Sequence, residues 1–131
     1  MTTQNVRQYV VDQLSPLLPA SWKWFRYWPT EENRVQVAVL LAFDSYSRNS
    51  SAPMGPRLAT FKLTLVERKA EPGKADDSLD AHIMDLLDVL DETAEDTNII
   101  WTNAERVVSN NQPAFDITLS LTIGHINQET P

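Results

Sequence analysis

Two runs of regular alternation between apolar and polar residues constrain the fold of this chain more than any other feature. Residues 57–67 read RLATFKLTLVE, and residues 114–123 read AFDITLSLTI. Successive side chains of a β-strand point to opposite faces of the sheet, so each run predicts a strand with one buried face. Such a sheet needs a layer of helices over its apolar face, and its other face stays wet or available to a partner.

The remaining segments complete the predicted order of elements. Val6, Val10 and Leu14 recur at helical spacing and predict a first helix that ends near Ser15, because prolines follow at positions 16 and 19. Residues 34–43 are apolar on both faces, which is typical of a central strand. Residues 77–95 predict a second helix whose core stripe is formed by Leu79, Ile83, Leu86 and Leu90.

Taken together, these segments predict one α+β domain over residues 1–126, followed by a mobile polar tail over residues 127–131. The element order is α-β-β-β-α-β-β. The sheet is mainly antiparallel, has about five strands and carries both helices on one face. Residues 44–56 predict a polar loop, and residues 99–108 and 114–123 predict a hairpin around residues 109–112.

Composition excludes several kinds of function. The 131 residues contain no cysteine, so thiol catalysis and cysteine-based zinc sites are excluded. We expect neither a signal peptide nor a membrane span, since no apolar run approaches 18 residues. The net charge is −7, divided as +4 over residues 1–75 and −11 over residues 76–131. Solubility alone explains such a charge, but basic and acidic portions also allow copies to meet front to back.

The polar residues offer few candidates for chemistry. His82 lies beside the core stripe of the second helix with Asp85 one turn on. A His–Asp pair can serve as a general base, but with no nucleophile or oxyanion site identified we interpret His82 as a boundary histidine in a salt bridge on the helix. His125 lies beside a strand end. The acids of residues 76–96 predict a solvated helix face, with Met84 inside it as a contact point for a neighbour. No catalytic, cofactor-binding or metal-ligating residue is predicted, and no cofactor.

The stretch SWKWFRYW, residues 21–28, holds three of the four tryptophans. Strand alternation places rings on both of its sides, so these rings can cover the core, stack on a peptide or a single-stranded nucleic acid, or meet another subunit. Because both sides are rich in rings, we expect at least one to face a partner. The residues predicted to lie at a subunit or partner interface are Trp22, Trp24, Arg26, Trp28, Arg48, Arg57 and Met84.

Over nearly its full length the chain resembles the tail terminator (tail completion) proteins of long-tailed phages, of the lambda-like fold and the actinophage type. The likeness is carried by VRQYVVDQLSPLLP, by APMGP before RLATFKLTLVE, and by the acidic helix DDSLDAHIMDLLDVLDE. Most of it lies in IIWTNAERVVSNNQPAFDITLSLTI. These are packing patterns and not a catalytic signature. The family has no fixed interface motif, so no site residue is carried over from it.

The resemblance implies a structural virion protein without enzymatic activity or cofactor. Such proteins form a ring, commonly a hexamer, at the head-proximal end of the tail tube after assembly in the host cytoplasm. Their partners are the major tail tube protein and the head-completion or connector protein, and DNA passes through the ring without specific binding. The alternatives are a head-completion or stopper protein, and a small peptide- or single-strand-binding module that uses residues 21–28.

Overall fold

The computed structural model describes residues 3–25, 37–48, 57–67, 72–109 and 112–123. Its elements are α1 (Thr3–Leu14), a 3₁₀ turn (Ser15–Leu17), β1 (Lys23–Phe25), β2 (Val37–Arg48), β3 (Arg57–Glu67), α2 (Pro72–Thr97), β4 (Ile99–Ser109) and β5 (Gln112–Ile123). The predicted α+β fold and its element order are confirmed.

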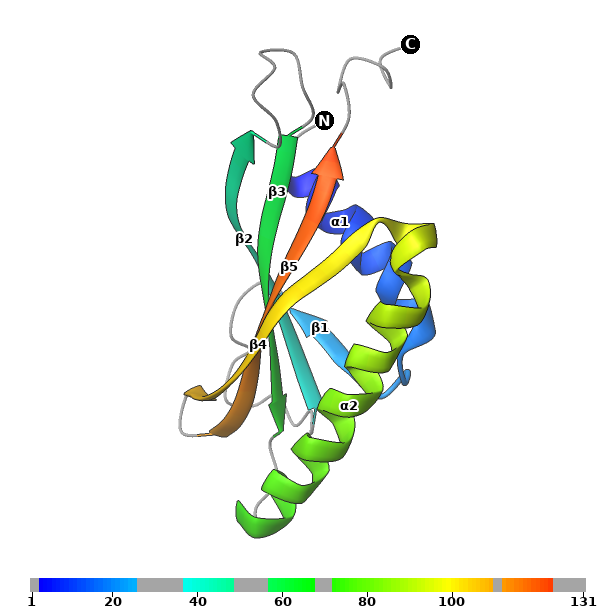
Figure 1. Ribbon diagram of the computed structural model, residues 1–131. Coiled ribbons are helices and arrows are strands. Elements are labelled where there is room, and N and C mark those ends of the chain that lie inside the picture. The colour runs from blue at the N-terminus through cyan, green and yellow to red at the C-terminus, as the bar shows by residue number, and fades with distance from the viewer. Residues whose placement is uncertain (1–2, 26–36, 49–56, 68–71, 110–111, 124–131) are drawn as a thin grey trace.

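The five described strands form one sheet in the order β1-β2-β3-β5-β4. The pairings are antiparallel except for the short parallel contact between β1 and β2. β4 and β5 form the predicted hairpin, in which Ser109 pairs with Gln112. Both helices cover one face of the sheet, with α1 near β2 and α2 running along β3, β5 and β4 (Figure 1).

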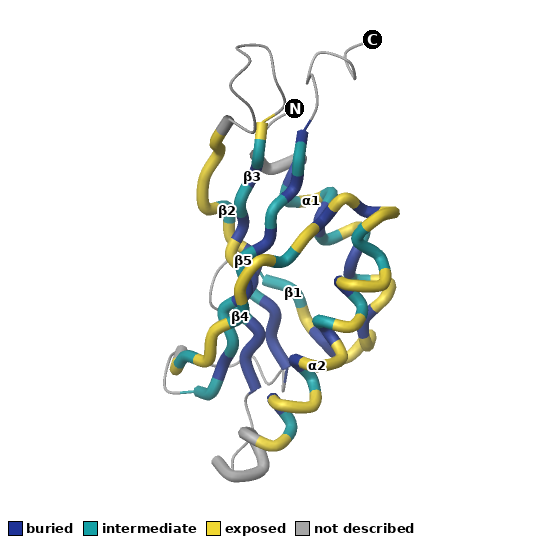
Figure 2. The backbone as a smooth tube through the Cα atoms, in the orientation of Figure 1, coloured by how far each residue is buried: buried dark blue, intermediate teal, exposed yellow. Residues whose placement is uncertain are grey.

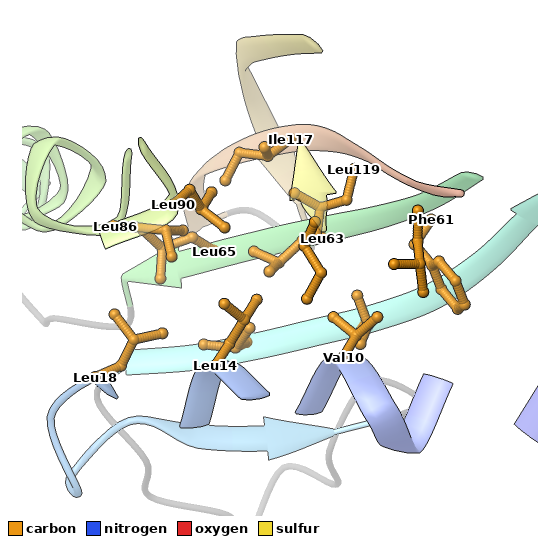
Figure 3. Close-up of a cluster of buried hydrophobic side chains, with 14 of the residues drawn as sticks. Val10, Leu14, Leu18, Phe61, Leu63, Leu65, Leu86, Leu90, Ile117 and Leu119 are labelled. Carbon is orange, nitrogen blue, oxygen red and sulfur yellow. The ribbon is translucent and has the colours of Figure 1, made fainter. Parts of the chain in front are cut away.

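The main core lies between this sheet face and the two helices. Val10 and Leu14 of α1 point toward Leu63 of β3, while Leu86 and Leu90 of α2 approach β3 and β5 (Figure 3). All of these side chains are buried. Truncation of such a residue to alanine costs about 2–5 kcal/mol, because it removes apolar contact and leaves a cavity. Packing of the helices' apolar stripes therefore holds the two layers together.

A second, smaller cluster lies on the opposite sheet face. Strand alternation separates Ala38, Val66 and Ala114 from the main core, and all three are buried. Farther along this face the central strands carry polar side chains. Thr64 Oγ1 donates a hydrogen bond to Asp116 Oδ1 at 2.7 Å, and Lys62 Nζ lies 4.0 Å from Asp116 Oδ2.

Several element boundaries differ from the sequence predictions. The loop predicted over residues 44–56 is wrong for residues 44–48, because β2 continues beside β3 past a bulge between Phe43 and Ser45. α2 begins at Pro72 and not at residue 77, since proline fits the first turn of a helix, where its missing N–H has no partner to lose. β1 begins at Lys23, and residues 26–28 of the aromatic stretch lie outside the described residues.

The C-terminal end of α2 is fixed by three hydrogen bonds. Asn98 adopts a positive φ of 62°, and its N–H donates to Ala94 O at 2.8 Å. Its side-chain Nδ2 donates to Thr122 O of β5 at 3.0 Å, while Tyr9 of α1 donates its hydroxyl to Thr97 O at 2.8 Å. The junction between α2 and β4 is thereby tied to both neighbouring elements. None of the described helices has the length and apolar character needed to cross a membrane.

Candidate functional site

The aromatic residues of β1 pack on both faces of their own sheet. Trp22, immediately before β1, is only 4% exposed, and Trp24 is half-buried against the main core. Phe25, which points the other way, packs against the second cluster. The interface prediction for Trp22 is therefore corrected: its burial makes it a core residue. Arg26 and Trp28 lie outside the described residues.

The other predicted interface residues occupy two separate places. Arg48 ends β2 and pairs in register with Arg57, the first residue of β3, which is exposed. Met84 lies far from both in the chain, on α2, and is 58% exposed.

Met84 lies on the side of α2 that borders β4. Asp80 Oδ1 lies 3.8 Å from Arg106 Nη1 of β4, and Asp91 Oδ1 accepts a 2.9 Å hydrogen bond from Trp101 Nε1 of β4. Residues spaced four and seven apart share one side of a helix, so Met84 lies in line with both aspartates. We call this surface, formed by Asp80, Met84, Asp91 and the exposed side chains of β4, the acidic edge.

A partly buried histidine–carboxyl pair joins α2 to β3. His82 Nδ1 and Glu67 Oε2 are hydrogen-bonded at 2.8 Å; the Glu67 side chain is fully buried, while the His82 side chain keeps 28% exposure. The Trp22 ring meets the imidazole edge-on, with centroids 5.3 Å apart. Within the described part of the chain, Glu67 Oε1 has no hydrogen-bond partner.

The sequence predicted Asp85 as the partner of His82, and the structure assigns that role to Glu67. Asp85 is exposed on the helix surface. The alternation of β3 could have identified Glu67 from the sequence. Every second residue from Ala59 to Leu65 points to the buried face, and Glu67 is the next residue in that series. A carboxylate on a buried face needs a polar partner, which the neighbouring helix supplies.

The His82–Glu67 pair resembles the histidine and carboxylate of a catalytic triad, but its described surroundings supply little else. No described serine or threonine hydroxyl hydrogen-bonds to His82. No three His, Cys, Asp or Glu residues of the described segments gather into a group that could hold a metal. What the geometry does supply is a polar clamp between α2 and the end of β3.

At each side of the sheet, a stretch of strand has no neighbouring strand among the described residues. β4 pairs only with β5, so its outer edge has no strand beside it in the described segments. β1 covers only Ala38–Leu40 of β2, and no described strand pairs with residues 41–48 on that side. Arg7 Nε of α1 donates to Leu41 O, at the start of this uncovered stretch, at 2.8 Å. Both edges carry exposed residues (Figure 2).

The charge division of the sequence coincides with these two sides. α1, β1, β2 and β3 together contain five Lys/Arg and three Asp/Glu, a net charge of +2. α2, β4 and β5 contain two Lys/Arg and eleven Asp/Glu, a net charge of −9. Because the strand order places β1 and β2 at one side and β4 at the other, one lateral half is weakly basic and the other strongly acidic.

No model of a known protein family matches this chain, and no curated protein matches it either.

Proposed function

We propose that this chain is a structural ring protein of the phage head–tail junction, namely a tail terminator that caps the head-proximal end of the tail tube. The starting point is the resemblance of its sequence segments to that family. The single observation that supports it most is the separation of basic and acidic charge onto the two lateral halves of the sheet. A molecule with two unlike, complementary sides suits head-to-tail contacts, which close into a ring when the rotation allows.

The acidic character of α2 agrees with a ring through which DNA slides. α2 contains nine Asp/Glu and one Lys. Protein affinity for the DNA backbone comes chiefly from Lys and Arg contacts to phosphates, so an acidic surface offers the passing duplex no such contacts. An acidic ring lets DNA leave without being held.

The alternatives differ in what they would bind. A head-completion or stopper protein would use the same separation of basic and acidic sides, but it would contact the connector and not the tail tube. A peptide- or single-strand-binding module would need stacking rings, and the described rings of that stretch, Trp22, Trp24 and Phe25, pack against their own core clusters. We therefore favour the terminator over the binding module.

The test is tube assembly with a major tail tube protein, which the proposal predicts as a partner of this chain. Added before polymerisation, the chain should shorten the tubes in electron micrographs in proportion to its concentration, and added afterwards it should appear as a cap at one end. Tubes of unchanged length and bare ends would overturn the proposal. Binding to isolated connectors with no effect on tubes would instead assign the stopper role.

A further inference from the structure

We propose that copies of this chain associate head to tail through backbone edges, with the outer edge of β4 in one copy pairing antiparallel with residues 42–48 of β2 in the next. This inference rests on the proposed function and specifies the subunit contact that the ring would use. The occupant of each edge is a second copy of this chain.

The direction of the strands permits this pairing. β4 is antiparallel to β5, β5 to β3, and β3 to β2, so β4 runs opposite to β2. A neighbouring copy in the same orientation therefore presents its β2 antiparallel to β4. Antiparallel pairing is slightly more stable per residue than parallel pairing.

The two stretches that no described strand covers also lie at the same height in the sheet. When the residue pairs are followed across the sheet through β5 and β3, Ile99 lies level with Tyr46. In the same way, Asn103 lies level with Ala42. Two copies placed side by side at the same height would thus bring the first half of β4 against the part of β2 that no described strand covers. Strand addition to an open sheet edge is a common mode of protein recognition.

Side-chain chemistry favours a second copy as the occupant. The acidic edge bears Asp80 and Asp91, whereas the side of the molecule that it would meet carries the net positive charge of α1, β1, β2 and β3. Ile100, which is 51% exposed in the first half of β4, would lose water contact in this pairing. The opposite net charges of the two sides would attract neighbouring copies, and the burial of Ile100 would stabilise the contact on the other face of the sheet.

Bulges interrupt both edges and make the pairing selective. One lies between Phe43 and Ser45 of β2, and the other lies between Trp101 and Asn103 of β4. Bulges twist an edge and protect it against indiscriminate strand addition. A partner strand that has its own bulge at nearly the same height can follow the irregular edge. A regular strand from another protein cannot.

Disulfide trapping tests the contact directly, because the chain has no cysteine of its own. Ile100→Cys and Ser45→Cys introduce single thiols at exposed, level positions on the two edges. Within one chain β2 and β4 are three strand spacings apart, roughly 14 Å, too far for an internal disulfide. Mild oxidation of a mixture of the two variants should give a covalent dimer on a non-reducing gel. One chain carrying both substitutions should give a ladder that ends at the ring size.

A third variant is the matched control. Val108→Cys also lies on β4 and is more exposed, at 76%, but it is eight residues from Ile100. It should cross-link to Ser45→Cys at least about tenfold less, because some 25 Å of strand separates the two β4 positions. Equal yields from Ile100→Cys and Val108→Cys would indicate random collision and overturn the pairing.

The remaining outcomes separate this inference from the proposed function. Cross-linking of Ile100→Cys mainly to itself would indicate a symmetric β4–β4 dimer and overturn the head-to-tail contact. A cap on the tail tube without the Ile100–Ser45 cross-link, with oxidation performed on those capped tubes, would overturn the edge contact and leave the terminator function standing. A cross-linked ladder without any effect on tubes would support the edge contact and overturn the terminator function.

Discussion

At the scale of single residues, the most constrained group is the Glu67 carboxylate. It is fully buried at the end of β3, and His82 satisfies only one of its two oxygens. A buried carboxylate loses its hydration, so its remaining hydrogen bond carries unusual weight. His82 also packs edge-on against Trp22, so one imidazole joins α2, β3 and the aromatic segment. Loss of this ring should therefore disturb all three.

We predict that His82→Ala lowers the free energy of unfolding by about 2–3 kcal/mol, because it leaves both Glu67 oxygens without a described partner. Glu67→Met should be less harmful, since it fills the space without a charge and leaves His82 partly in water. In the double variant the two losses should not add. Urea unfolding followed by tryptophan fluorescence measures all three.

Asp85→Ala is the control for this cycle. Asp85 lies three residues from His82 and is exposed, so its loss should change stability by no more than about 0.5 kcal/mol. If His82→Ala lowered the free energy of unfolding no more than Asp85→Ala does, the hydrogen bond between His82 and Glu67 would not contribute to stability.

At the scale of elements, the sequence predicted what periodicity controls and missed what pairing controls. The alternation of residues 57–67 and 114–123 identifies β3 and β5 because one face of each strand is buried. Residues 44–48 contain no such pattern, and they form strand because the backbone of β3 continues beside them. Trp22 is a second example, because a tryptophan ring suits a core and an interface equally well. Only its packing against His82 and the main core identifies it as a core residue. Tertiary partners far along the chain supply what local pattern cannot.

The turn from α2 into β4 gives a test at this scale. Asn98 adopts the left-handed conformation at the end of α2. Glycine adopts this conformation without strain and asparagine tolerates it, whereas for most other residues the β-carbon makes it about 1–2 kcal/mol less favourable. We predict that Asn98→Gly stays close to the wild type, losing only the side-chain hydrogen bond to Thr122, while Asn98→Ala lowers the melting temperature by roughly 4–6 °C. Calorimetry of the two variants separates backbone strain from the lost hydrogen bond. Equal melting temperatures for Gly and Ala would refute a strained turn.

At the scale of the whole molecule, the division of charge gives the subunit one acidic and one weakly basic side, unlike a protein that is acidic all over. A net charge of −7 repels other copies at long range, whichever surfaces they present. Head-to-tail association must overcome that repulsion with a local attraction between the acidic edge and the weakly basic side. The two effects respond differently to where a charge is changed, which makes them separable by experiment.

Two charge reversals on α2 provide the comparison. Glu95 lies one turn from Asp91, on the side that borders β4, whereas Asp85 lies three residues from His82, on the side toward Trp22. Glu95→Lys and Asp85→Lys change the net charge equally, so both reduce general repulsion by the same amount. We predict that Glu95→Lys nonetheless weakens self-association about tenfold in sedimentation equilibrium, because it places like charge against the basic side of the next copy, while Asp85→Lys leaves association unchanged or slightly stronger. Added salt should shrink the difference between them, since the attraction at the edge is screened. Identical behaviour of the two variants would mean that total charge alone governs association, and the acidic edge would then have no role in joining copies.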